Sequence, residues 1–345
     1  MRIAQITSVY LPVPPPSHGG TEWIVERLCR GLSRRGHEVT LFASGDSRPG
    51  VPVESVVEKA TLLDPDSTVY LEKELEARNS WNLYRQAGRF DLVHAHWPSL
   101  APYFSGCAPL PTVLTYAYIE PHLHRFYRQS CPNVHPVCIS RRQREILGEP
   151  DLPVVHNGIP VEEVPFRREP GEGLVFLGRM TPEKGAGDAV RIARALGERL
   201  LLIGDVTPHL PWSEPYFRAE VAPFVNGERV RHVRRLPNRE VLEALSRARA
   251  LLFPIRWEEP FGLAVVEAMA AGTPVLTLRR GAMPELVEDG VTGFVRESPE
   301  ELVEAARRVG ELDRAACRRR VEERFSVERM LDGYEEVYRR VVGCG

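Results

Sequence analysis

Residues 257–274 read WEEPFGLAVVEAMAAGTP, an acidic turn followed by an apolar segment. We expect a helix over Phe261–Ala271, because Pro260 suits the first helical position and Gly272 suits the residue after the last turn. The first N–H groups of a helix have no partner within it, so a helix start attracts anions and phosphate above all. The amides expected to bind such an anion are those of Phe261, Gly262 and Leu263.

Two glutamates, Glu259 and Glu267, frame this expected helix with seven residues between them. If most of the span is helical, they lie roughly 10–12 Å apart at about 1.5 Å per residue, which is about the reach of a nucleotide sugar from ribose to hexose. A carboxylate only accepts hydrogen bonds and therefore matches sugar hydroxyls, which donate them. One glutamate can hold the ribose diol and the other the hexose diol, with the diphosphate between them. The same spacing fits an ordinary amphipathic helix that carries two solvated glutamates.

Length and composition bound the class of protein. The length of 345 residues favours two domains, and 43% hydrophobic residues provide enough apolar material for cores. The net charge of −2 argues against general binding of polyanions such as nucleic acid, so any phosphate site must be local. The six cysteines are scattered without a C-x-x-C pair, which is typical of reduced thiols in a cytoplasmic protein. No apolar run is long enough to span a membrane, and Met1 leads straight into an expected strand, so neither a transmembrane helix nor a signal peptide is expected.

The first half alternates expected strands and helices. It begins with a strand over Arg2–Val9, a Pro/Gly loop that ends at Gly19 and Gly20, a helix over Thr21–Arg35 capped by its first residue, and a strand over Glu38–Ala43. This order is the βαβ unit of a parallel sheet. The first turn lacks G-x-G-x-x-G, which argues against a dinucleotide site. Further strands are expected over 90–94, 112–115, 134–140 and 153–156, and a further helix over 141–147.

The second half restarts after a charged linker over 162–172. A strand over Gly173–Leu177 leads into the loop GRMTPEKG, residues 178–185, and then into a helix that ends near Leu196. Arg179 can bind a phosphate through its planar fork and Lys184 as a compact charge, at the strand end where α/β sheets bind ligands. Isolated cations on a loop are more often solvated. Further strands are expected over 200–204, 229–233, 250–255 and 274–278, and further helices over 213–224, 238–247, and about 299–309, 311–323 and 326–341.

Two motifs carry a resemblance to a known family. The E-x7-E from Glu259 to Glu267 and the G-R-x-x-x-x-K-G of residues 178–185 are similar to signatures of the retaining glycosyltransferases of family 4, the superfamily of glycogen synthase and phosphatidylinositol mannosyltransferase. The similarity implies an α/β protein with the GT-B fold, in which two doubly wound Rossmann-like domains face a central cleft. It implies an acceptor-side domain over 1–163, a nucleotide-sugar-binding domain over 164–325, and a C-terminal helix over about 326–345 that packs back on the first.

The resemblance also implies roles for single residues. Arg179 and Lys184 hold the donor diphosphate, Glu259 holds the hexose and Glu267 holds the ribose. Catalysis is expected to depend on Glu259, Arg179 and Lys184. The donor-binding set further contains Gly19, Gly20, Phe261, Gly262 and Leu263. The turn Gly281–Glu285 resembles the family's G-G-x-P-E, with Ala282 in place of one glycine, and is expected to bring backbone amides near the sugar.

The chain departs from the family at Ala117, where many members carry the histidine of a Thr-x-His that approaches the donor sugar. The candidates to replace that histidine are Tyr118, Glu120, His122 and His124. The departure leaves the identity of the sugar open. No pattern in the sequence distinguishes uracil from guanine as the base of the donor.

Two patterns bear on a metal ion. Asp64-Pro65-Asp66 is a D-x-D, which a different class of glycosyltransferases uses to hold a metal on the diphosphate, but it falls in an expected polar loop. His94 and His96 are close together without an evident third ligand, and they resemble the family's strand-end loop beside the cleft, so a structural or acceptor-side role is favoured. We expect no metal and no cofactor other than the nucleotide-sugar co-substrate, since two cations and a helix start supply the positive charge.

The predicted activity is a retaining, metal-independent transfer of a hexose from a UDP- or GDP-hexose to a hydroxyl acceptor. The acceptor is a sugar, a small molecule or a lipid-linked compound, and a peripheral membrane contact is left open. Two alternatives also remain. One is a sugar-nucleotide epimerase of the same fold, and the other is a catalytically silent nucleotide-sugar-binding partner protein.

Overall fold

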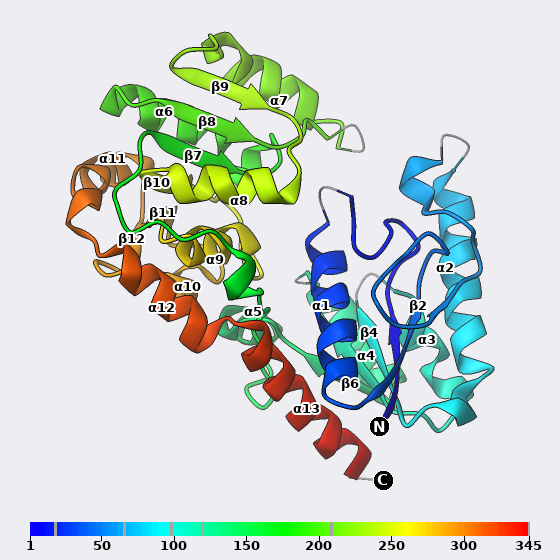
Figure 1. Cartoon of the computed structure of the whole chain (residues 1–345). Helices are drawn as coiled ribbons and strands as arrows, with labels where there is room; N and C mark the ends of the chain where they lie inside the picture. Colours follow the sequence, from blue (N-terminus) through cyan, green and yellow to red (C-terminus); the bar gives the residue numbers. More distant parts are fainter. Residues whose placement is uncertain (17–18, 65–66, 97–98, 119, 208–209, 344–345) are drawn as a thin grey trace. The chain divides into compact units, whose positions relative to one another are not determined.

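Two six-stranded sheets with parallel strand pairing form the framework of the chain. The computed structural model describes residues 1–16, 19–64, 67–96, 99–118, 120–207 and 210–343. The chain divides into two units, one of Met1–Gly158 with Val327–Gly345 and one of Ile159–Ser326. Helices surround the sheet in each unit (Figure 1). The expected α/β class with two doubly wound sheets is therefore confirmed.

The first unit contains the sheet β3-β2-β1-β4-β5-β6. Its strands are β1 (Arg2–Ile6), β2 (Glu38–Phe42), β3 (Val53–Glu54), β4 (Leu92–His96), β5 (Thr112–Thr115) and β6 (Val134–Val137). Its α-helices are α1 (Gly20–Arg34), α2 (Val69–Tyr84), α3 (Ala101–Phe104), α4 (Pro121–Ser130), α5 (Arg141–Leu147) and α13 (Val327–Gly343). The strand order reverses between β1 and β4.

The second unit contains the sheet β12-β11-β10-β7-β8-β9. Its strands are β7 (Leu174–Leu177), β8 (Leu200–Ile203), β9 (Val230–Val233), β10 (Ala250–Phe253), β11 (Val275–Leu278) and β12 (Gly293–Arg296). Its α-helices are α6 (Ala186–Leu196), α7 (Ser213–Glu220), α8 (Asn238–Arg247), α9 (Leu263–Ala270), α10 (Met283–Leu286), α11 (Pro299–Arg307) and α12 (Arg314–Arg324). Here the order reverses between β7 and β10, which are neighbours. Such a reversal opens a crevice at the carboxyl ends of the strands, where α/β proteins bind ligands.

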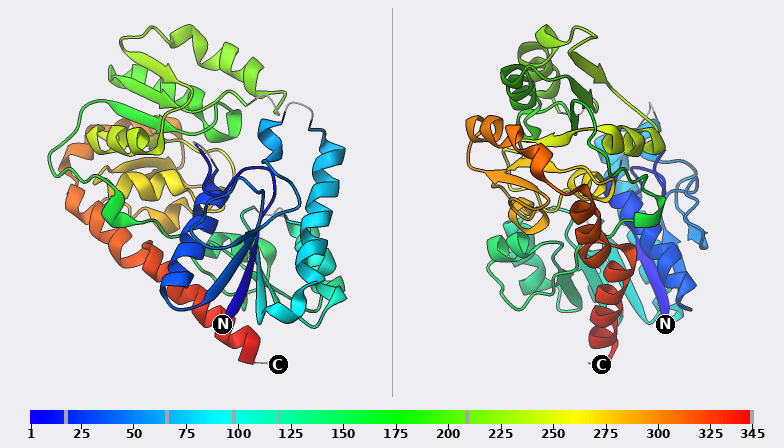
Figure 2. Two further views of the ribbon diagram at one scale, coloured as in Figure 1. Left: turned by 45° about the vertical axis from the view of Figure 1, so that its right-hand side comes forward. Right: turned by 60° about the vertical axis from the view of Figure 1, so that its left-hand side comes forward.

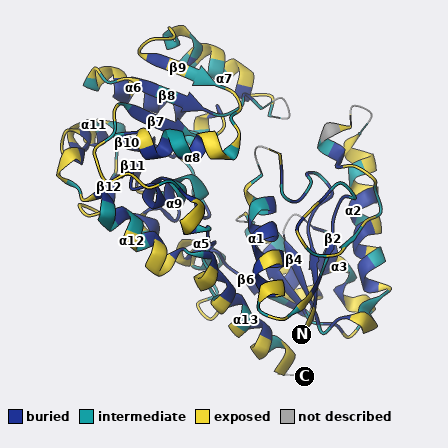
Figure 3. Cartoon of the chain, in the orientation of Figure 1, coloured by how far each residue is buried: buried dark blue, intermediate teal, exposed yellow. Residues whose placement is uncertain are grey.

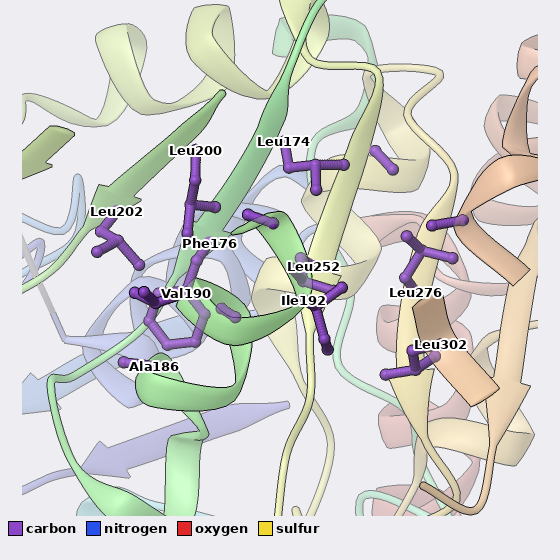
Figure 4. Packing of buried hydrophobic residues seen from close by; sticks show 14 of the residues in the cluster. Leu174, Phe176, Ala186, Val190, Ile192, Leu200, Leu202, Leu252, Leu276 and Leu302 are labelled. Carbon is purple, nitrogen blue, oxygen red and sulfur yellow. The ribbon is translucent and has the colours of Figure 1, made fainter. Parts of the chain in front are cut away.

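The core of the second unit explains why its strands read as continuous apolar runs. Phe176 and Leu202 point from β7 and β8 toward α6, and Leu252 and Leu276 extend the same layer under α11 (Figure 4). The central strands are buried while the surrounding helices expose one face (Figure 3). A parallel sheet covered on both sides requires apolar residues on both faces of its strands.

The last helix, α13, belongs to the first unit and packs beside α1 (Figure 2). Tyr338 Oη lies 2.6 Å from His94 Nδ1, and Tyr334 Oη lies 2.8 Å from Thr115 Oγ1. All four side chains are buried. The helix therefore contributes polar partners to the first sheet as well as apolar contacts. Among the described residues, no helix combines the length and apolar character that a bilayer crossing requires.

Several elements differ from the expected ones. α1 begins at Gly20, and its N-cap is Gly19 at φ 135° rather than Thr21. β4 ends at His96, so both histidines lie within a strand. The expected strand over 153–156 is reduced to a single bridge between Cys138 and Val154. The sequence pattern indicated neither α2 nor α4 nor β12.

Candidate functional site

The loop after β7 carries the first expected donor motif at the carboxyl edge of the second sheet. β7 ends at Leu177, and a single 3-10 turn at Pro182–Lys184 precedes α6. Gly185, at φ 78°, joins this turn to the helix, and a Cβ atom there would overlap the carbonyl of Pro254. Glycine is therefore required for the loop to pack directly against the chain that leaves β10.

The acidic turn after β10 carries the second motif, and a hydrogen bond joins it to the first. Arg256 N–H donates to Glu183 O at 2.9 Å. Within the turn, Glu259 N–H donates to Trp257 O at 2.9 Å. Since β7 and β10 are neighbours in the sheet, the two loops meet at the point where the strand order reverses.

The turn Gly281–Glu285 supports the acidic turn with its backbone. Gly281 N–H donates to Glu258 Oε2 at 3.1 Å, and Ala282 N–H donates to Glu259 O at 2.9 Å. A Cβ atom on Gly281, which has φ 54°, would overlap the backbone of Glu259. Both amides are thus bound within the protein, and the approach of this turn to a sugar stays a prediction.

Lys184 and Glu259 form an ion pair in which Lys184 Nζ donates to Glu259 Oε2. Their side chains are only 13% and 12% exposed, so solvent screens the pair less than it screens an exposed one. Trp257 completes the cluster, since its Nε1–H donates to the same Oε2 at 2.8 Å and its ring centroid lies 4.8 Å from Lys184 Nζ. The structure thus brings one expected phosphate-binding cation and one expected sugar-binding carboxylate into direct contact.

Arg179, the second expected phosphate-binding cation, begins the loop that contains Lys184. Its side chain is 45% exposed, and its Nη2 lies 3.8 Å from Glu183 Oε1. This long, exposed ion pair holds the guanidinium weakly. Arg179 is therefore available to an anion at the edge of the sheet.

Asp188, in the first turn of α6, connects the helix that follows the first loop to Arg256 in the second loop. Both oxygens of its buried carboxylate accept from Arg256, with Arg256 Nη2 2.8 Å from Oδ1, and Arg191 Nη2 donates to Oδ1 at 2.7 Å. Burial alone would raise the pKa of Asp188, but the hydrogen bonds and charges of the two arginines outweigh burial and hold that pKa below its ordinary value. Sequence reasoning missed this network and Trp257, because neither belongs to the motifs.

The helix α9 starts two residues later than expected. It begins at Leu263 with Gly262 as N-cap at φ 109°, so Pro260 is not a helical residue. Val265 N–H already donates to Gly262 O at 3.0 Å, which leaves Leu263 and Ala264 as the amides without a partner inside the helix. Phe261 precedes the helix, and its ring is buried 6.0 Å from that of Phe325.

Glycine is also favoured at the N-cap of α9, because Gly262 has φ 109°, a backbone conformation that residues with a side chain rarely adopt. Glu267 lies within α9 and is half-buried. Glu259 therefore lies before the start of α9, and Glu267 lies in its second turn.

Gly19 and Gly20 belong to the first unit, whereas Arg179, Lys184, Glu259 and Glu267 belong to the second. Gly19 O accepts from Trp23 N–H at 3.2 Å as α1 begins. A Cβ atom on Gly19 would lie 2.7 Å from Glu22 Oε2. Burial raises the pKa of Glu22.

The histidine pair is buried in the first sheet. His94 Nε2 lies 2.7 Å from Thr115 Oγ1, and His96 Nε2 lies 2.7 Å from Gln5 Oε1. Burial lowers the pKa of His96 to about 3 and that of His94 well below its ordinary value. These neutral rings thus have protein partners. No group of three metal-ligating side chains occurs among the described residues, and Pro65 and Asp66 of the D-x-D lie outside them.

The four candidates to replace the family histidine differ in availability. His124 is buried between Tyr116 Oη at 2.9 Å and Glu149 Oε1 at 2.8 Å, so both of its ring nitrogens are occupied. Glu120 caps α4 by accepting from His122 N–H. Tyr118 and His122 expose their side chains. His124 is therefore excluded as a direct contact to a sugar.

Two family models match the chain. A model described as Glycosyltransferase Family 4 matches residues 18–163, and one described as Glycosyl transferases group 1 matches residues 171–311. Glycogen synthase of Mycobacterium tuberculosis (strain CDC 1551 / Oshkosh) is 28% identical, and the match covers 93% of this chain and 88% of that protein. Phosphatidyl-myo-inositol mannosyltransferase of Mycobacterium leprae is 25% identical, with 86% and 83% covered.

Solved structures with the same fold cover nearly the whole chain. AviGT4, a glycosyltransferase involved in avilamycin A biosynthesis, has a TM-score of 0.73 at 25% identity and covers 100% of this chain and 99% of its own. Anabaena Alr3699/HepE, in complex with UDP and glucose, has a TM-score of 0.74 at 18% identity, with 98% and 99% covered. The two expected motifs therefore occur in a chain that matches these two solved structures along nearly its whole length.

Proposed function

We propose that this chain, which belongs to the family 4-like GT-B superfamily of glycosyltransferases, moves a hexose from a nucleotide-diphosphate sugar to a hydroxyl acceptor with retention of configuration and without a metal ion. The observation that carries the proposal is the meeting of Lys184 and Glu259 where the strand order of the second sheet reverses. The crevice at such a reversal is the usual place for a nucleotide in an α/β sheet.

The leaving group sets the chemical requirement of the reaction. Negative charge builds on the diphosphate as the glycosidic bond breaks, and fixed positive groups beside it lower the barrier. Lys184 lies in the loop after β7, beside the reversal of strand order, Arg179 extends from the same loop, and the first amides of α9 add partial positive charge. Together these groups supply the charge that a metal ion supplies in other transferases.

The two glutamates are assigned to the two sugars. We infer that Glu267, within α9, accepts from the ribose hydroxyls and that Glu259 accepts from the hexose hydroxyls. The anomeric carbon then becomes oxocarbenium-like, and the acceptor oxygen attacks from the face that the phosphate leaves. Retention is taken from the family resemblance. The route is attack on the face that the phosphate leaves, because no side chain of the described site is assigned as a covalent nucleophile.

Only analogy with a related structure bears on which base and which hexose the donor contains. Alr3699/HepE has been determined with UDP and glucose, and this supports a UDP-hexose as the first donor to test. The acceptor is proposed only as a hydroxyl compound, because the relatives named above are a glycogen synthase and a lipid mannosyltransferase.

Product analysis tests the proposal. The protein is incubated with UDP-glucose, UDP-galactose or GDP-mannose and with an α-glucan, an inositol phosphate or a lipid-linked inositol, and the products are separated by mass spectrometry. Transfer gives a nucleoside diphosphate and an α-linked glycoside, whereas an epimerase gives an isomeric donor and no glycoside. A silent binding protein gives neither product but is stabilised by UDP or GDP, and inverted linkage would contradict retention.

A further inference from the structure

Trp257 contacts both members of the ion pair in the proposed donor site, Lys184 and Glu259, although it lies outside both motifs. Its indole N–H donates to Glu259 Oε2 at 2.8 Å, and its ring centroid lies 4.8 Å from Lys184 Nζ. Its carbonyl accepts from Glu259 N–H at 2.9 Å, so the two residues are also joined through the backbone. Trp257 is therefore held beside Glu259 independently of the ion pair.

The two oxygens of Glu259 are used unequally. Lys184 and Trp257 both donate to Oε2. In the part of the chain that the structure describes, Oε1 accepts no hydrogen bond. A carboxylate held at one oxygen presents the other in a fixed direction, which is what recognition of a sugar hydroxyl requires.

A bound diphosphate would compete with Glu259 for Lys184. It carries more negative charge than one carboxylate, so the ammonium is drawn toward it. Glu259, at 12% exposure, would then lose its cation close to a new negative group. The indole N–H is neutral and fixed in the turn, so its hydrogen bond to Oε2 does not depend on Lys184.

We propose that Trp257 is a positioning residue of the transfer reaction. Its N–H keeps Glu259 oriented when Lys184 moves from the carboxylate to the diphosphate, and its ring stabilises the ammonium along that short path through a cation–π contact. This inference rests on the proposed function, because it requires a diphosphate-linked donor in this site.

Two substitutions separate the functions of the indole. Trp257→Phe keeps an aromatic face for Lys184 but removes the N–H, and Trp257→Leu removes both. Trp81→Phe is the matched control, because Trp81 is 55% exposed on α2 in the other unit. For each protein we would measure binding of UDP and GDP by calorimetry, kcat and donor KM with the active donor, and the thermal midpoint of unfolding.

The expected result is a split between binding and turnover. In Trp257→Phe, kcat falls about tenfold while the Kd for the nucleoside diphosphate stays within about threefold, because a hydrogen bond to a charged group is lost but the aromatic face remains. In Trp257→Leu, kcat falls by the same factor, and the protein also binds the nucleoside diphosphate several-fold more weakly. Trp81→Phe matches the wild type in all measurements.

Three results would overturn the inference. Turnover of Trp257→Phe within twofold of the wild type refutes positioning while leaving the transferase function in place. Equal losses of binding, turnover and thermal stability in Trp257→Phe and Trp257→Leu indicate a merely structural tryptophan. A wild-type protein that neither binds UDP or GDP nor transfers a sugar refutes the proposed function, and this inference with it.

Discussion

Lys184 donates to Glu259 between the loops that follow β7 and β10, two neighbouring strands far apart in sequence. Each partner has a proposed second use, the cation for a diphosphate and the carboxylate for a hexose. The ion pair and the donor therefore compete for the same groups. The competition makes single substitutions informative, because they affect binding and turnover in different directions.

Removing the cation should abolish recognition of the diphosphate. Wild-type protein with UDP or GDP at 100 times its Kd gains about 2.7 kcal/mol of stability, which thermal unfolding detects easily. We expect Lys184→Ala and Arg179→Ala to lose this shift, and Lys73→Ala, an exposed lysine on α2, to keep it. A normal shift in both site variants would refute the assignment of the diphosphate.

Neutralising the carboxylate should have opposite effects on binding and on turnover. Glu259→Gln frees Lys184 from its ion pair, so the Kd for UDP or GDP alone should decrease several-fold. Transfer should nevertheless fall about 100-fold, because the hexose loses a charged acceptor in the transition state. Calorimetry and product release measure the two quantities, and unchanged affinity for UDP or GDP would show that the ion pair does not compete.

The network beneath the loops should contribute stability that depends on pH. The pKa of Asp188 in the folded protein lies below its ordinary value, so its contribution is fully present above that value and is lost as pH falls through the folded-state pKa. Asp188→Asn should lower the free energy of unfolding by about 2 kcal/mol at neutral pH, as expected when charge-assisted hydrogen bonds are lost. Urea unfolding should show this difference shrinking below about pH 4, and a constant difference would contradict it.

A second buried carboxyl should act in the opposite direction. Burial raises the pKa of Glu76 to about 8, and one of its oxygens accepts from Val9 N–H at 2.7 Å. The folded state therefore binds more protons than the unfolded state between the ordinary pKa of about 4.3 and the raised one. Stability should fall as pH rises through this window, and Glu76→Gln should flatten the fall. The free energy of unfolding of the wild type and of Glu76→Gln is measured between pH 5 and 8. An equal dependence on pH in the two proteins would contradict this prediction.

The architecture followed from patterns that the structure preserves. Apolar runs such as 174–177 and 250–253 are strands because a doubly covered parallel sheet buries both faces. α2 was missed because its apolar residues do not follow one face, as Tyr70 and Trp81 are exposed while Leu75 and Leu83 are buried. The hydrophobic period carries no information in such a helix.

The candidate site was less predictable than the fold. The motif spacing pointed to Lys184 and Glu259, but it assigned both to a ligand and so could not indicate that they bind each other. The start of α9 was misplaced because Pro260 suits a helix start in general, whereas Gly262 at positive φ marks the actual cap. Trp257 acquires its contacts only when two loops meet, which no local pattern encodes.

The hydroxyls of Tyr334 and Tyr338 pair with groups on β4 and β5, although more than two hundred residues separate these strands from α13. On a ribosome, the first sheet therefore emerges long before its last polar partners do. The tyrosine partners of His94 and Thr115 are therefore synthesised only when translation of the 345 residues is almost complete. Termination before codon 334 would leave a nascent chain that has all six strands of the first sheet but lacks the two tyrosine hydroxyls that contact His94 and Thr115.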